Sequence, residues 1–235
     1  VPTFQENRVT IDLTLGSQLR AMLKLSLIDF RYIVKNWLFH LLLVLGVLVL
    51  VFTLSKVTNR GDFTFLPLTR IMLSVPMFFF STVIVLLTFI YSGMLVHRPG
   101  LAKASQLIDS TATSNWVLLG SKILALLQLQ LFMLSFLMVC GIGLQVYNGY
   151  YHFEIGLYIF HLLLITFPVL MVWAALSVFT HTIIPNLYLG IFLLLMVWLG
   201  IGLLPQIGLM THLFRFNSPP QLIYSDLNGY GDGLS

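Results

Sequence analysis

The chain has 235 residues, of which 58% are hydrophobic and only 9% are charged, and its mean hydropathy is +0.97. A soluble domain of this size needs more surface charge than 12 basic and 8 acidic side chains supply, so we expect lipid to cover much of the outside. The formal net charge of +4 is spread along the chain without interleaved stacking aromatics, which argues against a nucleic-acid partner. A lone cysteine, Cys140, excludes an intrachain disulfide and a cysteine-based metal cluster.

The N-terminal third of the chain begins with a segment, residues 1–16, that lacks the basic start and apolar core of a signal peptide. Residues 17–36 follow with basic residues at helical spacing among leucines, isoleucines and phenylalanines. This pattern predicts an amphipathic helix that lies along the membrane surface. The alternative is an ordinary basic flank of the first span. The candidate contacts with the membrane surface are Arg20, Lys24, Arg31 and Lys35.

Five apolar runs come next, and each is long enough to cross a hydrocarbon core. They are continuous and rich in leucine, which favours helices over the alternating strands of a barrel. Residues 37–207 are therefore predicted to form an all-α membrane bundle of five spans, and 208–235 an extracytoplasmic segment. Prolines at 76 and 168 are expected to bend their spans. The runs are 37–54, 71–96, 116–146, 155–179 and 186–207.

Basic residues between the spans predict the orientation of the bundle. If the N-terminus is cytoplasmic, the inner side carries eight basic residues and the outer side four, so we expect this orientation. The inner eight are Arg8, Arg20, Lys24, Arg31, Lys35, Arg98, Lys103 and Lys122, and the outer four are Lys56, Arg60, Arg70 and Arg215.

Motifs for chemistry are missing from the sequence, which has no HExxH, GxSxG or P-loop pattern, so we expect no enzyme activity and no bound cofactor or metal in this chain. The predicted spans contain no Asp or Glu, which disfavours an ion-coupled carrier. Each polar side chain at membrane depth has two interpretations, helix packing, which we favour, or the lining of a pathway. These side chains are His40, His161, Gln128, Gln130, Ser135 and Gln145.

The longest predicted cytoplasmic connection between spans runs from His97 to Asn115, and its part from Arg98 onward is the candidate docking segment. A segment in this place could form a short helix that docks on a cytoplasmic ATPase, or it could be a solvated loop. The candidate coupling residues are Arg98, Lys103, Ala104, Leu107 and Asp109.

Four stretches of the sequence carry a resemblance to a known family: 149–158 (GYYHFEIGLY), 186–190 (NLYLG), 212–216 (HLFRF) and 224–231 (YSDLNGYG). Over almost its whole length the chain resembles ABC-2 type permeases. It is most similar to the second permease segment of bacterial proteins in which two such segments precede a zinc aminopeptidase domain. It departs from the family at Met94, where members carry a glutamate after the glycine that matches Gly93.

The resemblance implies an ABC-2 type bundle in the bacterial inner membrane, with an elbow helix at 17–36 and a sixth span expected after residue 235. We expect the chain to be part of a longer protein whose peptidase domain lies elsewhere. The implied function is the permease part of an ABC transporter, driven by separate cytoplasmic ATPases that bind the ATP. The expected partners are a second permease segment, these ATPases, membrane lipids and an extracytoplasmic peptidase domain. The alternative function is a membrane anchor or scaffold for an extracytoplasmic peptidase or partner, without transport.

Overall fold

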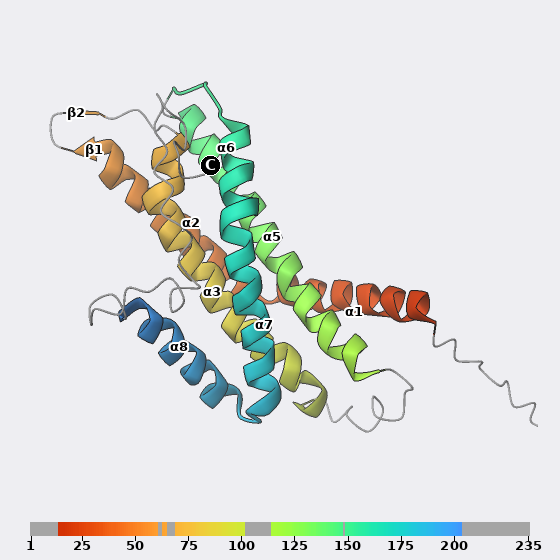
Figure 1. The fold of residues 1–235 in the computed structure, drawn as a ribbon. Helices are drawn as coiled ribbons and strands as arrows, with labels where there is room; N and C mark the ends of the chain where they lie inside the picture. Colours follow the sequence, from red (N-terminus) through yellow and green to blue (C-terminus); the bar gives the residue numbers. More distant parts are fainter. Residues whose placement is uncertain (1–13, 61–62, 65–68, 102–113, 148, 204–235) are drawn as a thin grey trace, which may run out of the picture.

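The computed structural model describes residues 14–60, 63–64, 69–101, 114–147 and 149–203. Within these ranges the fold is a bundle of long helices, drawn in Figure 1, with one two-stranded hairpin. The hairpin pairs β1 (Asn59–Arg60) with β2 (Phe63–Thr64) in an antiparallel register, with Asn59 opposite Thr64. The all-helical membrane class predicted from the apolar runs agrees with this architecture.

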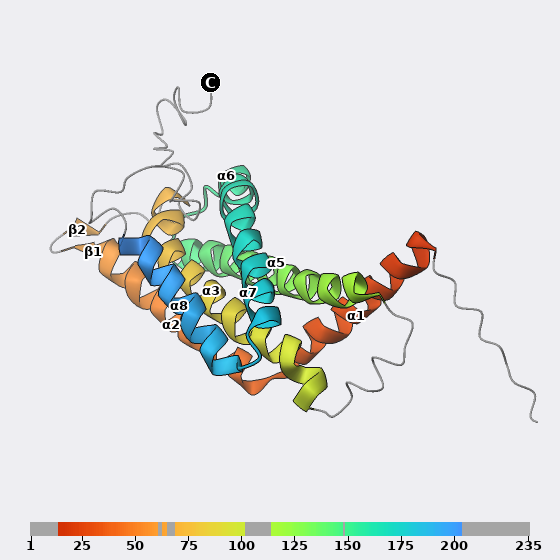
Figure 2. The ribbon, with the colours of Figure 1, turned by 60° about the horizontal axis from the view of Figure 1, so that its bottom comes forward.

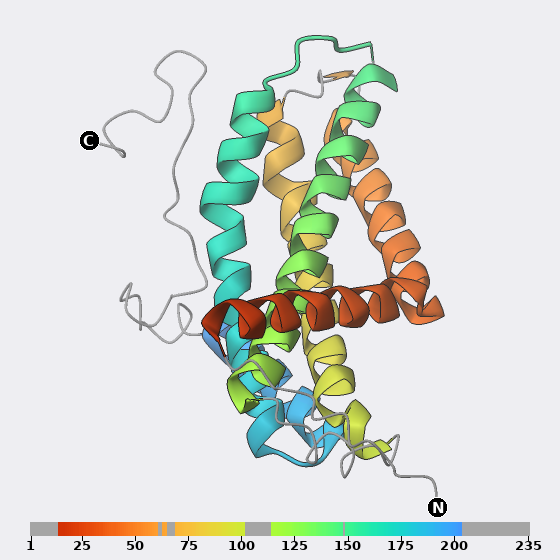
Figure 3. The ribbon, with the colours of Figure 1, turned by 90° about the vertical axis from the view of Figure 1, so that its right-hand side faces the viewer.

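The first two helices, α1 (Leu15–Lys35) and α2 (Trp37–Thr58), meet at a bend of 66°. Asn36 makes the bend because its backbone is extended (φ −75°, ψ 131°), which ends α1. Its side-chain Oδ1 then accepts a hydrogen bond from the backbone N–H of Leu38 at 3.0 Å, which caps the start of α2. In consequence α1 crosses the bundle instead of running along it, as Figure 3 shows.

Three longer elements form the centre of the bundle. These are α3 (Thr69–Leu101), α5 (Asn115–Tyr147) and a composite helix of α6 (Ile155–Ile159), η1 (Phe160–Thr166) and α7 (Phe167–Ile183). Trp173 and Phe89 pack edge to face at the core with ring centroids 5.4 Å apart, and both are fully buried. With 33 residues, α5 is about 50 Å long, so it extends beyond a hydrocarbon core of about 30 Å.

The predicted run 155–179 is a composite helix because Pro168 interrupts its hydrogen bonding. Proline has no backbone N–H for a carbonyl one turn earlier, and the seven residues before α7 adopt the wider π-helical pattern. Within this segment Thr166 Oγ1 donates to the carbonyl of His161, five residues earlier, at 3.0 Å. The helix type therefore changes next to Pro168, while the expected bend stays a prediction.

The last described helix, α8 (Leu187–Leu203), turns back beside α3, as Figure 2 shows. Asn186 caps it, since Oδ1 accepts from the N–H groups of Tyr188 and Leu189 at 3.0 and 3.3 Å. The structure describes 17 residues of this helix, and the rest of the predicted run 186–207 lies outside the described residues.

Length and composition allow three of the described helices to cross a membrane, or four if α1 and α2 are one bent span. The three are 80–98, 115–147 and 155–183, and α8 is a shorter apolar helix. Helices therefore occupy the described parts of all five predicted runs, while the number of five spans stays a prediction. Segments 1–16 and 208–235 fall wholly or almost wholly outside the described residues.

Candidate functional site

Charged side chains from three helices meet where α1 crosses the bundle. Asp29 of α1 lies 3.5 Å from Arg98 of α3, measured from Oδ1 to a guanidinium nitrogen, and 3.8 Å from Lys122 of α5, measured from Oδ2 to Nζ. We call these three residues the ionic junction. The side chains of Asp29 and Lys122 are only 13% and 15% exposed, whereas Arg98 is 43% exposed. The contact between Asp29 and Lys122 is therefore the better shielded of the two.

Close packing between α1 and α5 brings Asp29 and Lys122 together. Gly120 lies directly against α1, because a Cβ there would lie 2.6 Å from Sδ of the flexible Met22 side chain. One turn before Asp29, Ser26 is fully buried and accepts a hydrogen bond from Nε2 of Gln128 at 3.3 Å. Gly120 and Gln128 of α5 thus both contact α1 beside the ionic junction.

The electrostatics of the junction are unbalanced, since one carboxylate faces two cations. Burial raises the pKa of Asp29 above its ordinary value, while Lys122 and Arg98 act in the opposite direction. Arg98 is the more exposed of the two cations, and its guanidinium carbon lies 4.3 Å from the ring centroid of Tyr32 on α1. Arg98 therefore contacts α1 through both an aromatic ring and a carboxylate.

The junction spans the two flanks of the predicted coupling segment. Arg98 lies in the last turn of α3, and Lys122 lies in the second turn of α5, so both helices that border residues 102–113 contact Asp29. The second predicted run ended at residue 96 and the third began at residue 116, whereas α3 continues as a helix to Leu101 and α5 begins at Asn115. Arg98 and Asn115 are therefore helical, and the docking role of the segment stays a prediction. The apolar run in the sequence ends near Val96, but α3 continues for about one more turn, where Arg98 contacts Asp29 and Tyr32 of α1. The other candidate coupling residues, Lys103, Ala104, Leu107 and Asp109, lie outside the described residues.

The four predicted membrane-surface residues form a second charged feature, which we call the cationic stripe. All four are exposed and lie about 180° to 240° around α1 from Asp29, so they point away from the bundle. Between the stripe and the packed face runs a ridge of exposed leucines at 19, 23 and 27. Helix α1 therefore has one face for the bundle, one apolar exposed face and one cationic face. The stripe consists of Arg20, Lys24, Arg31 and Lys35.

Polar side chains also gather inside the bundle, between α3, α5 and α7. Gln130 is fully buried, and its Nε2 donates to Oγ1 of Thr88 at 3.2 Å and to the carbonyl of Leu170 at 2.9 Å. Nearby, the hydroxyls of Ser92 and Ser177 bond to each other across α3 and α7. Gln128 and Gln130 thus bond different neighbouring helices, which agrees with the helix-packing interpretation for both.

The same interior contains His181 of α7, a residue that the sequence did not single out. Its Nε2 lies 3.3 Å from the carbonyl of Phe89, and its ring packs edge to face on His97 with centroids 5.7 Å apart. Cβ atoms added at Gly190 and Gly93 would lie 2.5 and 2.8 Å from this ring. Two glycines on α8 and α3 therefore leave the space that the imidazole fills.

Sequence reasoning also missed the central role of Asp29. The available signal was that Asp29 is the only acidic residue of α1 and lies opposite the cationic stripe on the helical wheel. Lys122 was counted only as an orienting charge. Among the described residues, no group of three or more His, Cys, Asp or Glu side chains could hold a metal ion.

No family model matches this sequence, and neither a curated protein nor a solved structure matches it. The structure shows an all-helical chain with three or four helices that could cross a membrane. The chain is a membrane protein by this composition and architecture.

Proposed function

We propose that this chain is a permease segment of an ABC transporter, driven by separate cytoplasmic ATPases that act on residues 102–113. The observation that carries the proposal is the ionic junction. One buried carboxylate on the crossing helix α1 contacts both helices that border this segment. A movement of residues 102–113 by an ATPase would therefore move α1 together with α3 and α5.

The physical basis is rigid-body coupling. Helices move as units when their packed contacts persist, and a helix that crosses two others transmits the motion of both. Met22 against Gly120 and Ser26 against Gln128 hold α1 to α5 beside the junction. In our proposal ATPase closure therefore moves α1, α3 and α5 together and changes access to a pathway between this segment and a second one.

The polar interior favours a pathway outside this single bundle. Gln130, Ser92 and Ser177 are fully buried and hold α3, α5 and α7 together, so they fill the centre of the described helices. We place the pathway between two permease segments, with an apolar cargo such as a lipid-like molecule or a peptide. The N-terminus is cytoplasmic in this proposal, and the membrane is the bacterial inner membrane.

Co-purification from native membranes tests the proposal. The full-length protein should bring down a stoichiometric ATPase. Aspartates at Ala104 and Leu107 should reduce this association, because they place unpaired charge in the contact. As a matched control, aspartates at Tyr151 and His152, exposed in the connection at the other end of α5, should leave it unchanged. An ATPase that stays bound to the 104/107 variant, or one that never binds the unaltered protein, favours the alternative of a membrane scaffold without transport.

A further inference from the structure

The ring of His181 is enclosed near the ends of three helices. In Figure 1 the C-terminal ends of α3 and α7 and the N-terminal end of α8 lie at the same end of the bundle. His181 is 1% exposed, and a Cβ added at Gly190 of α8 or at Gly93 of α3 would lie 2.5 or 2.8 Å from its ring. We call these two glycines the cage of His181. The imidazole therefore packs closely against both neighbouring helices.

The hydrogen bonding of His181 assigns its proton. Nε2 lies 3.3 Å from the carbonyl oxygen of Phe89. A carbonyl oxygen only accepts, so the neutral ring carries its hydrogen on Nε2 and leaves a lone pair on Nδ1. Nδ1 is buried without a hydrogen-bond partner among the described residues, and it is the ring atom closest to a Cβ added at Gly190. A second proton would therefore enter between α7 and α8, where no described group accepts it.

No described counter-charge faces the imidazole from the helices packed around it. Helices α7 and α8 contain no Asp, Glu, Lys or Arg, and the one other titratable side chain on them, Tyr188, is 80% exposed. From α3 the titratable neighbour is His97, whose ring centroid lies 5.7 Å away and whose buried Nε2 also has no described partner. The cations of α3 and α5 in the ionic junction contact Asp29 instead. A protonated His181 would thus be a buried charge without a counterion, which is a costly state.

The packing of α8 depends on the same ring. Of the residues in this helix only Gly190 and Leu194 are buried, and they lie one turn apart on the face that meets α3 and α7. A small surface therefore holds α8 to the bundle, and the contact with His181 is a large part of it. We propose that protonation of His181 releases α8 from α3 and α7. This response to acid needs no ATPase and goes beyond the transport function proposed above.

Proton linkage gives the sign and size of the effect. Docked α8 binds one proton fewer than undocked α8, because only the undocked ring reaches water. Docking is therefore favoured at neutral pH and weakens as the pH falls through the range of about 8 to 5 in which histidine changes charge. For one proton, the ratio of docked to undocked chains changes by at most about tenfold per pH unit.

The distance between two spin labels measures the docking of α8 in the chain. The labels are attached at Tyr188→Cys on α8 and Trp116→Cys on α5, two exposed positions at the same end of the bundle, with Cys140→Ser as the background. In lipid nanodiscs, pulsed electron resonance should give one distance at about pH 8 and a second, growing population towards about pH 5. The same distance distribution at both pH values would overturn the proposal.

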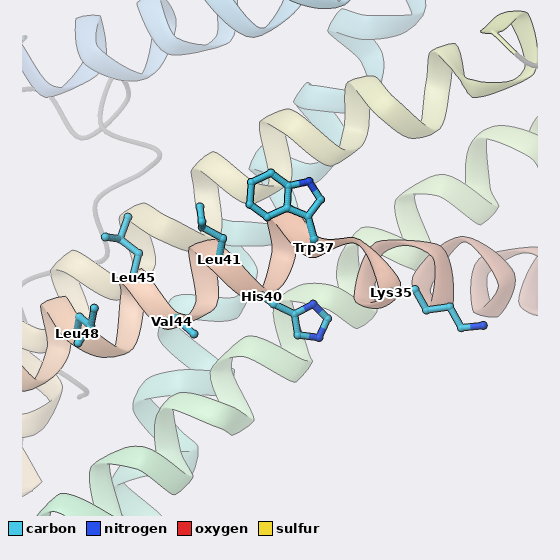
Figure 4. Close-up of a pocket in the computed structure, with 7 residues that line it drawn as sticks. All are labelled: Lys35, Trp37, His40, Leu41, Val44, Leu45 and Leu48. Carbon is cyan, nitrogen blue, oxygen red and sulfur yellow. The ribbon is translucent and has the colours of Figure 1, made fainter.

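Neutral replacements identify the responsible histidine. His181→Gln keeps a donor for the carbonyl of Phe89, and His181→Phe keeps a ring in the cage, so α8 should stay docked in acid in both variants. The matched control is His40→Gln, because Nδ1 of His40 also lies 3.0 Å from a carbonyl oxygen, but its ring is exposed in the first turn of α2 beside Trp37, as Figure 4 shows. This control should respond to acid like the unaltered chain. Release by acid in a docked His181 variant, or its loss in His40→Gln, would refute the role of His181.

A further variant decides the case in which both His181 replacements already release α8 at about pH 8. At acidic pH a charged His97 repels a proton on the neighbouring ring. His97→Gln removes this repulsion and leaves His181 in its cage, so the release of α8 should move to lower pH. A midpoint that does not move would overturn the proposal.

Discussion

Removal of the charge on Asp29 should destabilise the fold more than removal of either cation, because it leaves Lys122 shielded without a counterion. At 3.8 Å and an effective dielectric constant near 20, the attraction between Asp29 and Lys122 is about 4 kcal/mol before the cost of desolvation. Arg98 lies closer, at 3.5 Å, but it is 43% exposed, so water reduces its attraction to about 1 kcal/mol. We expect Asp29→Asn to lower the free energy of unfolding by about 3 kcal/mol.

Double-mutant cycles measure this ordering. We expect a coupling of about 2 kcal/mol between Asp29→Asn and Lys122→Met, and less than about 1 kcal/mol between Asp29→Asn and Arg98→Gln. The assay is unfolding of the purified chain in mixed micelles by increasing dodecyl sulfate, followed by tryptophan fluorescence. Additive effects for Asp29 and Lys122, or equal couplings for the two cations, would refute the reasoning that burial decides which contact matters.

The glycine beside His181, the buried Gln130 and the cationic stripe each give a further test. Gly190→Ala should lower the free energy of unfolding by about 1–3 kcal/mol, since its Cβ meets the ring of His181. Gly143→Ala on α5 has open space and should stabilise the fold by up to about 1 kcal/mol. Similar changes in stability for both variants would contradict the close fit of glycine against the His181 ring. Gln130→Ala should cost about 1–2 kcal/mol in the same unfolding assay, and Ser135→Ala, exposed on that helix, should change stability by less than about 0.5 kcal/mol. Replacement of all four cations of the cationic stripe by glutamine removes about 4 kcal/mol of attraction to an anionic membrane and should invert part of the population, as read from thiol accessibility at the two ends of α5. An unchanged orientation would show that the stripe does not orient the chain.

The sequence by itself determined the helical class and the approximate position of each helix. Continuous apolar runs leave few alternatives to helices in lipid, because every backbone polar group must be bonded within its own segment. The amphipathic pattern of α1 was also legible, since helical periodicity places residues four apart on one face. Asparagines at 36 and 186 mark two helix starts, and in both places the side chain caps the helix as local hydrogen-bonding rules expect.

The tertiary structure alone decided which of these helices touch, and with them the candidate site. Asp29 and Arg98 are 69 residues apart, and no local pattern states that a carboxylate on a crossing helix will meet a cation at the end of another. The cage around His181 likewise depends on glycines from two other helices. Periodicity reports the face that a residue occupies, whereas pairing depends on crossing height and angle, which side-chain volumes such as those of Met22 and Gly120 set only when the helices pack.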